Sequence, residues 1–281
     1  MASQIQRTHS ILVIGGTGKT GRRVVRQLSS LDTEIRVGSR TAGVPFDWRD
    51  RTSWKPALRD VESIYISYYP DLAVPGAVED VQELTDLAVK SGVRRMVLLA
   101  GRGEDEALRA EEVVQSAGVE WTIVRSAWFN QNFDENYLLE PIQSGEVALP
   151  VGEVPEPFID AEDIASVAVA ALTEDGHEGQ VYEVTGPRLL TFEQAVQEIA
   201  QVSGREIRFT SVPLERYTSI MQQQEVPAEF VGLLTYLFGE VLDGRNASVA
   251  DGVQRALGRE PKDFADYARD VAATGVWNIK Q

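Results

Sequence analysis

A glycine-rich turn near the N-terminus has the composition and spacing of a phosphate-binding loop. Gly15, Gly18 and Gly21 follow a short apolar run at 11–14 and precede a helical pattern at 21–28. Such a turn uses one glycine for a sharp bend, one to let a pyrophosphate approach the backbone, and one for close packing of helix on strand. The free N–H groups of the following helix then face the phosphates. The turn therefore predicts a dinucleotide site.

The same turn contains Gly18-Lys19-Thr20, which raises the alternative of a nucleoside triphosphate loop. That loop requires a further glycine five positions before Gly18, where this chain has Val13 inside the apolar run. The spacing thus favours a dinucleotide over a triphosphate.

The residues after the second predicted strand indicate which dinucleotide binds. An NAD site usually has a carboxylate there, which holds the ribose 2′-OH. Here the strand at 34–37 is followed by Gly38-Ser39-Arg40, without a carboxylate. Arg40 can hold a 2′-phosphate with two hydrogen bonds, and Ser39 can donate a third. We therefore expect the cofactor to be NADP(H).

Strand and helix patterns alternate through the first two thirds of the chain, which predicts an α/β fold. We expect a Rossmann doubly wound parallel sheet with a smaller, mostly helical C-terminal lobe. The predicted domains are a dinucleotide-binding domain at 1–131 and 159–186 and a substrate-binding lobe at 132–158 and 187–281. Predicted strands lie at 11–14, 34–37, 44–47, 64–68, 95–100, 121–124, 181–184 and 207–209, and predicted helices at 21–28, 78–89, 104–116, 164–172, 192–202 (after an N-cap at Thr191), 228–242 and 263–273.

Composition excludes several kinds of chemistry. The 281 residues include no cysteine, so disulfides, thiolate nucleophiles and cysteine-bound metals are ruled out. The two histidines, His9 and His177, lack partners at metal-ligand spacing, and we expect both at the surface and no metal site. A net charge of −16 disfavours nucleic acid. No apolar run reaches the roughly 20 residues of a membrane span, and no signal peptide is evident, so we expect a cytoplasmic protein without a membrane partner.

Eight motifs of the chain, including the glycine turn and the segment that ends at Arg40, resemble those of a known family. They are Gly15-Gly16-Thr17-Gly18-Lys19-Thr20-Gly21, Val37-Gly38-Ser39-Arg40, Phe46-Asp47-Trp48, Ser91-Gly92-Val93-Arg94-Arg95-Met96-Val97-Leu98-Leu99, Trp121-Thr122-Ile123-Val124-Arg125, Trp128-Phe129-Asn130-Gln131-Asn132-Phe133, Phe158-Ile159-Asp160-Ala161-Glu162-Asp163-Ile164-Ala165 and Tyr182-Glu183-Val184-Thr185-Gly186-Pro187. Together they resemble the NmrA-like branch of the atypical short-chain dehydrogenase/reductases. Within it the chain is most similar to NAD(P)H-dependent quinone or azo reductases and ergot-alkaloid-type iminium reductases. The resemblance extends to about Pro213 and weakens beyond it.

The resemblance and the motifs together define a candidate site. The resemblance implies that Asp47 meets the adenine amino group with Trp48 packed beside it. It also implies that the nicotinamide lies near 67–70 and 100–102, and that 128–133 lines the side of a small-molecule substrate. The cofactor-binding candidates are Gly15, Thr17, Gly18, Lys19, Thr20, Gly21, Ser39, Arg40, Asp47, Trp48, Ser67, Tyr68, Ala100 and Gly101, and the substrate-binding candidates are Trp128, Phe129 and Asn132.

One departure from the short-chain dehydrogenases affects the chemistry. Those enzymes carry a Tyr-x-x-x-Lys pair whose tyrosine protonates the product oxygen. Here Gly103 and Ala107 stand where that pair would fall. Three interpretations remain open: a reductase of an iminium ion, quinone or activated alkene; a non-catalytic redox sensor with a protein partner; or a ketone reductase with Tyr68 or Tyr69 as the acid. The sequence does not determine the oligomeric state.

Overall fold

A computed structural model describes residues 10–278 and divides the chain into two compact units. The first contains the chain up to Ala100, with Glu106–Val124 and Ala165–Val181, and the second contains Gly101–Asp105, Arg125–Ile164 and the chain from Tyr182 onward. These bounds count 101–105, 125–131, 159–164 and 182–186 with the second unit, although the sequence predicted them in the dinucleotide-binding domain.

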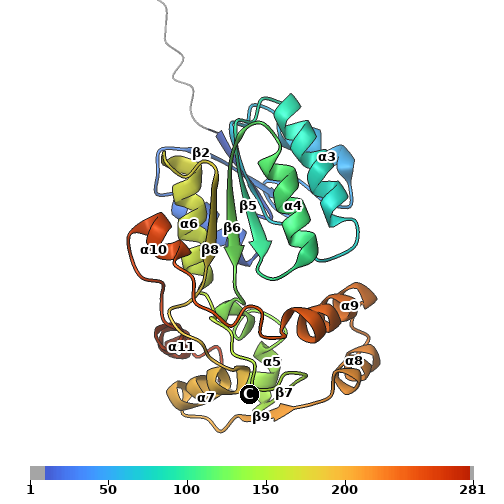
Figure 1. Cartoon of the computed structure of the whole chain (residues 1–281), viewed down its shortest axis with the longest axis vertical. Coiled ribbons are helices and arrows are strands. Elements are labelled where there is room, and N and C mark those ends of the chain that lie inside the picture. The colour runs from blue at the N-terminus through green and yellow to red at the C-terminus, as the bar shows by residue number, and fades with distance from the viewer. Residues whose placement is uncertain (1–9, 279–281) are drawn as a thin grey trace, which may run out of the picture. The chain divides into compact units, whose positions relative to one another are not determined.

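The central element is a seven-stranded sheet in the order β3-β2-β1-β4-β5-β6-β8, as predicted for a Rossmann fold (Figure 1). β1 pairs in parallel with β2 and β4, β2 with β3, and β4 with β5. The strands are β1 (Ser10–Ile14), β2 (Glu34–Ser39), β3 (Val44–Pro45), β4 (Ser63–Ile66), β5 (Arg95–Gly101), β6 (Glu120–Ser126) and β8 (Gln180–Val184).

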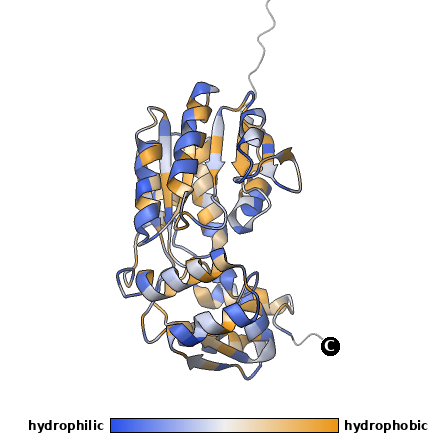
Figure 2. Cartoon of the chain, turned by 90° about the vertical axis from the view of Figure 1, so that its right-hand side faces the viewer, coloured by the Kyte–Doolittle hydropathy of each residue, from blue (hydrophilic) through white to orange (hydrophobic). Residues whose placement is uncertain are grey.

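Helices connect these strands and bury one apolar side each. In α1 that side includes Val24 and Leu28, and in α3 it includes Val81, Leu84 and Ala88. Figure 2 shows hydrophobic residues concentrated along the strands and hydrophilic residues on the helices beside them. The helices are α1 (Lys19–Leu28), η1 (Arg51–Ser53), α2 (Trp54–Ala57), α3 (Ala77–Lys90), α4 (Asp105–Gln115) and α6 (Ala161–Thr173).

The second unit is mostly helical around its own core. Its short β7 (Glu146–Leu149) and β9 (Arg208–Ser211) pair in parallel. Thr191 caps α7 and forms a capping box with Gln194, so the predicted N-cap is confirmed. The remaining elements are η2 (Asn130–Asn132), α5 (Leu139–Ser144), α7 (Phe192–Ser203), α8 (Leu214–Gln223), α9 (Ala228–Tyr236), a π-helical turn (Leu237–Val241), α10 (Gly252–Leu257) and α11 (Phe264–Ala273).

The structure corrects one expectation about the histidines. His177 is buried rather than at the surface, because its loop packs under Trp121 and Thr122: the Thr122 hydroxyl donates to the His177 carbonyl at 2.7 Å. His9 lies outside the described residues. No helix within 10–278 is long and apolar enough to span a membrane.

Candidate dinucleotide site

The glycine turn joins β1 to α1 with an open helix N-terminus. Gly15 adopts a φ of +73°, which glycine tolerates best, and the Gly18 N–H donates to its carbonyl at 2.8 Å. A Cβ at Gly21 would lie 2.1 Å from the Gly15 carbonyl oxygen, so close packing requires this glycine. Within 10–278 no side chain caps α1, and its first turn contains no acidic residue.

Space and charge at this turn fit a pyrophosphate. Gly18 is exposed, and a Cβ there would approach only the Gly15 carbonyl, at 3.1 Å. The exposed Thr17 lies beside it, and Lys19 begins the helix. Thr20 faces inward instead, where its hydroxyl accepts a hydrogen bond from Tyr65 at 2.9 Å. An exposed, uncapped helix N-terminus is a suitable binding site for anions.

The end of β2 lies directly beside this turn. The N–H groups of Gly15 and Gly16 both donate to the Gly38 carbonyl, at 3.0 and 3.2 Å. Ser39 follows, but its hydroxyl donates to the Ala42 carbonyl at 2.6 Å and so serves the local turn. Arg40 is exposed, and among residues 10–278 it forms no ion pair with a carboxylate. Arg40 is therefore an exposed cation at the C-terminal end of β2.

Trp48 and Asp47 lie at the same edge. The buried indole of Trp48 donates to the Ser67 carbonyl at 3.2 Å, which connects the segment after β3 to the end of β4. Asp47 is half-buried, and its Oδ1 accepts from the Arg49 N–H at 3.0 Å. A Cβ at Gly15 would lie 3.2 Å from the Ser67 carbonyl oxygen, so the fold brings the turn, Ser67 and Trp48 together.

The two tyrosines proposed as acids have different surroundings. Tyr68 packs on Trp48, with ring centroids 4.5 Å apart, and its hydroxyl donates to Asp80 of α3 at 2.7 Å. Tyr69 is 47% exposed, and the Arg40 guanidinium lies over its ring. The Tyr68 proton is thus engaged with a carboxylate, and the Tyr69 ring with a cation.

β5 ends in small residues. Ala100 is buried, and a Cβ at Gly101 would meet the Glu104 carboxylate at 1.9 Å. Gly103 has a φ of +81° and lies against Asn246, whereas Ala107 is fully buried on α4. A side chain at Gly103 would therefore have to displace the Asn246 side chain, and a larger residue in place of Ala107 would enter a fully buried position.

The predicted substrate-side segment divides between core and partly exposed positions. Phe133 is fully buried, packed against Phe158 at 5.5 Å, and so belongs to the core rather than to a substrate surface. Trp128, Phe129 and Asn132 remain half-buried. The Trp128 ring packs against the core at 5.2 Å from Phe238, so it also contributes to packing.

A buried carboxyl group that sequence reasoning missed lies in the second unit. Glu156 is 2% exposed, and its Oε1 has no hydrogen-bond partner within 10–278. Burial raises the pKa of Glu156 to about 7, although the nearby Arg102 lowers it. Arg102 cannot fully compensate this carboxylate, because its guanidinium already binds Glu183 and the carbonyls of Asn246 and Ser248. No local pattern in the sequence signals this environment.

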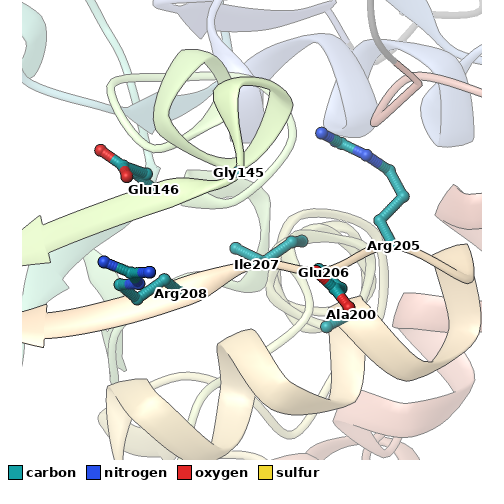
Figure 3. A pocket seen from close by; sticks show the side chains of 7 residues that line it. All are labelled: Gly145, Glu146, Ala200, Arg205, Glu206, Ile207 and Arg208. Carbon is teal, nitrogen blue, oxygen red and sulfur yellow. The ribbon is translucent and has the colours of Figure 1, made fainter.

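A separate hollow of about 440 Å³ lies in the second unit, along 145–146, 200 and 205–208 (Figure 3). Figure 3 shows Arg205 well apart from Glu146 and Arg208, on the opposite side of the view. Arg205 donates to the carbonyls of Ile142 and Gln143, so it serves the fold. The hollow contains none of the predicted site residues and is not assigned a function.

The parallel sheet and its open glycine turn define a dinucleotide-binding protein of the Rossmann class. The family model described as NAD(P)H-binding matches residues 15–175, and that of the NmrA-like family matches residues 104–268. The chain therefore belongs to the NmrA-like family, as the sequence motifs indicated.

Full-length relatives define the class further. The chain is 31% identical to the NAD(P)H azoreductase of Xenophilus azovorans, over 94% of this chain and 98% of that protein. It is 30% identical to festuclavine synthase II of Penicillium roqueforti, over 92% and 97%. In fold it is similar to the Citrobacter sp. triphenylmethane reductase complexed with NADP(H), with a TM-score of 0.75, 19% identity and coverage of 93% and 99%. The protein is an oxidoreductase of the atypical short-chain dehydrogenase/reductase type.

Proposed function

We propose that this protein is an NADP(H)-dependent reductase that transfers hydride to a small, electron-poor organic substrate: an iminium ion, a quinone or an activated alkene. The observation that carries the cofactor preference is Arg40 at the end of β2, an exposed guanidinium that forms no ion pair with a carboxylate within 10–278. A 2′-phosphate favours such a cation, whereas a free 2′-OH is usually held by a carboxylate at this position. The azoreductase relative supports a reductase of this kind.

The residues of the chain would bind and orient the reactants. The N–H groups at the start of α1 would hold the pyrophosphate, and Arg40 the 2′-phosphate. Asp47 would accept a hydrogen bond from the adenine amino group. A bound reduced nicotinamide supplies the hydride. On the substrate side we propose Trp128, Phe129 and Asn132, which are half-buried and retain accessible surface.

The substrate class follows from the residues that would have to supply a proton. Gly103 and Ala107 offer no acid where the Tyr-x-x-x-Lys pair would stand, and the Tyr68 hydroxyl donates to Asp80. Hydride addition neutralises an iminium ion directly, and a reduced quinone is a stable anion, so neither needs a strong enzyme acid. We therefore favour these acceptors over simple ketones.

Replacing the tyrosines tests this assignment. Tyr68→Phe and Tyr69→Phe should each change the rate of NADPH oxidation with an iminium or quinone acceptor by less than about tenfold, because these acceptors need no enzyme acid. Loss of a working general acid would instead lower the rate by about 100-fold or more. Steady-state NADPH oxidation measures this. A loss of about 100-fold in either variant would identify a working acid and shift the assignment to ketone reduction.

A further inference from the structure

Arg40 and Tyr69 are in contact at the C-terminal ends of β2 and β4, the two strands that flank β1. The Arg40 Cζ lies 4.8 Å from the centroid of the Tyr69 ring, within the range of a cation–π interaction. Arg40 follows β2 and Tyr69 comes shortly after β4, and both strands pair with β1, which ends at the glycine turn. The contact thus joins the ends of the two strands that flank the turn.

Arg51 is a second arginine that lies over an aromatic ring, and it differs from Arg40 in its ion pairs. Arg51 also lies over an aromatic ring, that of Trp54, but it is bound by the carboxylates of Asp80 and Glu83. Arg40 has no such ion pair among residues 10–278. A ring covers one face of a guanidinium and leaves its N–H edge free, and that edge is the part that binds phosphate with two parallel hydrogen bonds.

We propose that Tyr69 is a specificity-determining positioning residue, whose ring holds the Arg40 guanidinium in place for the 2′-phosphate of NADP(H). The inference rests on the proposed cofactor preference and adds a residue to it. An exposed arginine loses side-chain entropy when it binds a ligand, and a stacked one has lost part of it beforehand. The ring acts through its π face, so the Tyr69 hydroxyl is not needed.

Binding of two nucleotide fragments to the full chain tests this role without any turnover. The fragments 2′,5′-ADP and 5′-AMP differ only in the 2′-phosphate, and calorimetry measures the affinity of each. Wild type should prefer 2′,5′-ADP. Tyr69→Leu should weaken 2′,5′-ADP about two- to fivefold and leave 5′-AMP unchanged, as expected for an exposed cation–π contact. Tyr69→Phe should keep the wild-type preference for 2′,5′-ADP, because it retains the aromatic ring.

A double variant tests whether Tyr69 acts through Arg40. Arg40→Ala should remove the preference, and adding Tyr69→Leu to it should have no further effect. Tyr69→Met, a second non-aromatic variant, should behave like Tyr69→Leu, and thermal unfolding of each variant should match wild type because Tyr69 is 47% exposed.

Three results would overturn the role of Tyr69 while leaving the cofactor proposal intact. These are an unchanged preference in both non-aromatic variants, an equal loss for both fragments, or a loss in Tyr69→Phe as large as in Tyr69→Leu. If wild type instead binds the two fragments equally, the cofactor preference itself fails, and the role of Tyr69 fails with it.

Discussion

Glu156 is the residue at which burial and charge conflict most clearly. Its carboxyl is 2% exposed, and burial raises its pKa from 4.5 to about 7. Between these two values the folded protein keeps a proton that the unfolded chain has released. The stability contributed by this proton is therefore lost as the pH rises from about 4.5 to about 7, by an amount on the order of 3 kcal/mol.

Replacing Glu156 by glutamine should remove this dependence. Measured by denaturant unfolding, Glu156→Gln should gain on the order of 3 kcal/mol relative to wild type between pH 5 and pH 8, because the amide does not ionise. The exposed Glu153, replaced in the same way, is the control and should change little. A Glu156→Gln difference that stays constant over this pH range would contradict the raised pKa.

Residues whose position depends on local spacing could be placed from the sequence. Gly15, Gly18 and Arg40 occupy positions set by the turn and the next strand, and the structure brings them to one edge of the sheet. The burial of Phe133 and Glu156 could not be predicted in this way, because both depend on packing against segments distant in the sequence.

At the scale of elements, we expect different glycines of the turn to be needed for folding and for cofactor binding. A Cβ at Gly21 would overlap the Gly15 carbonyl, whereas a Cβ at the exposed Gly18 would approach only that carbonyl, at 3.1 Å. We expect Gly18→Val to remain folded but lose cofactor binding, and Gly21→Val to be strongly destabilised because its Cβ would overlap the backbone. Thermal unfolding and calorimetry with NADPH measure the two effects. A folded Gly18→Val variant with full affinity would contradict the assignment of the turn.

Several elements that the sequence did not reveal lack a clear signal within their own residues. A strand was predicted at 207–209, where β9 lies, but β7 was not predicted, because the strand it pairs with is about 60 residues away in the chain. α5 and α10 have six residues each, too few to display a clear apolar period. The long, regular α3 and the capped α7 were predictable because both pattern and end signals lie within the element itself.

At the scale of the whole molecule, the net charge of −16 opposes an anionic cofactor. Binding must therefore depend on local groups that outweigh the average field, and we propose the N-terminus of α1 and Arg40 as such groups.

The most direct test of the central claim is NADPH consumption by the purified full chain with a panel of acceptors. The panel contains a quinone, a cyclic iminium ion, an activated alkene and a simple ketone, each offered with NADPH and with NADH. We expect steady oxidation with at least one of the first three acceptors, faster with NADPH than with NADH, and little with the ketone. Tight binding of NADPH without turnover of any acceptor would contradict the reductase and indicate a redox sensor instead.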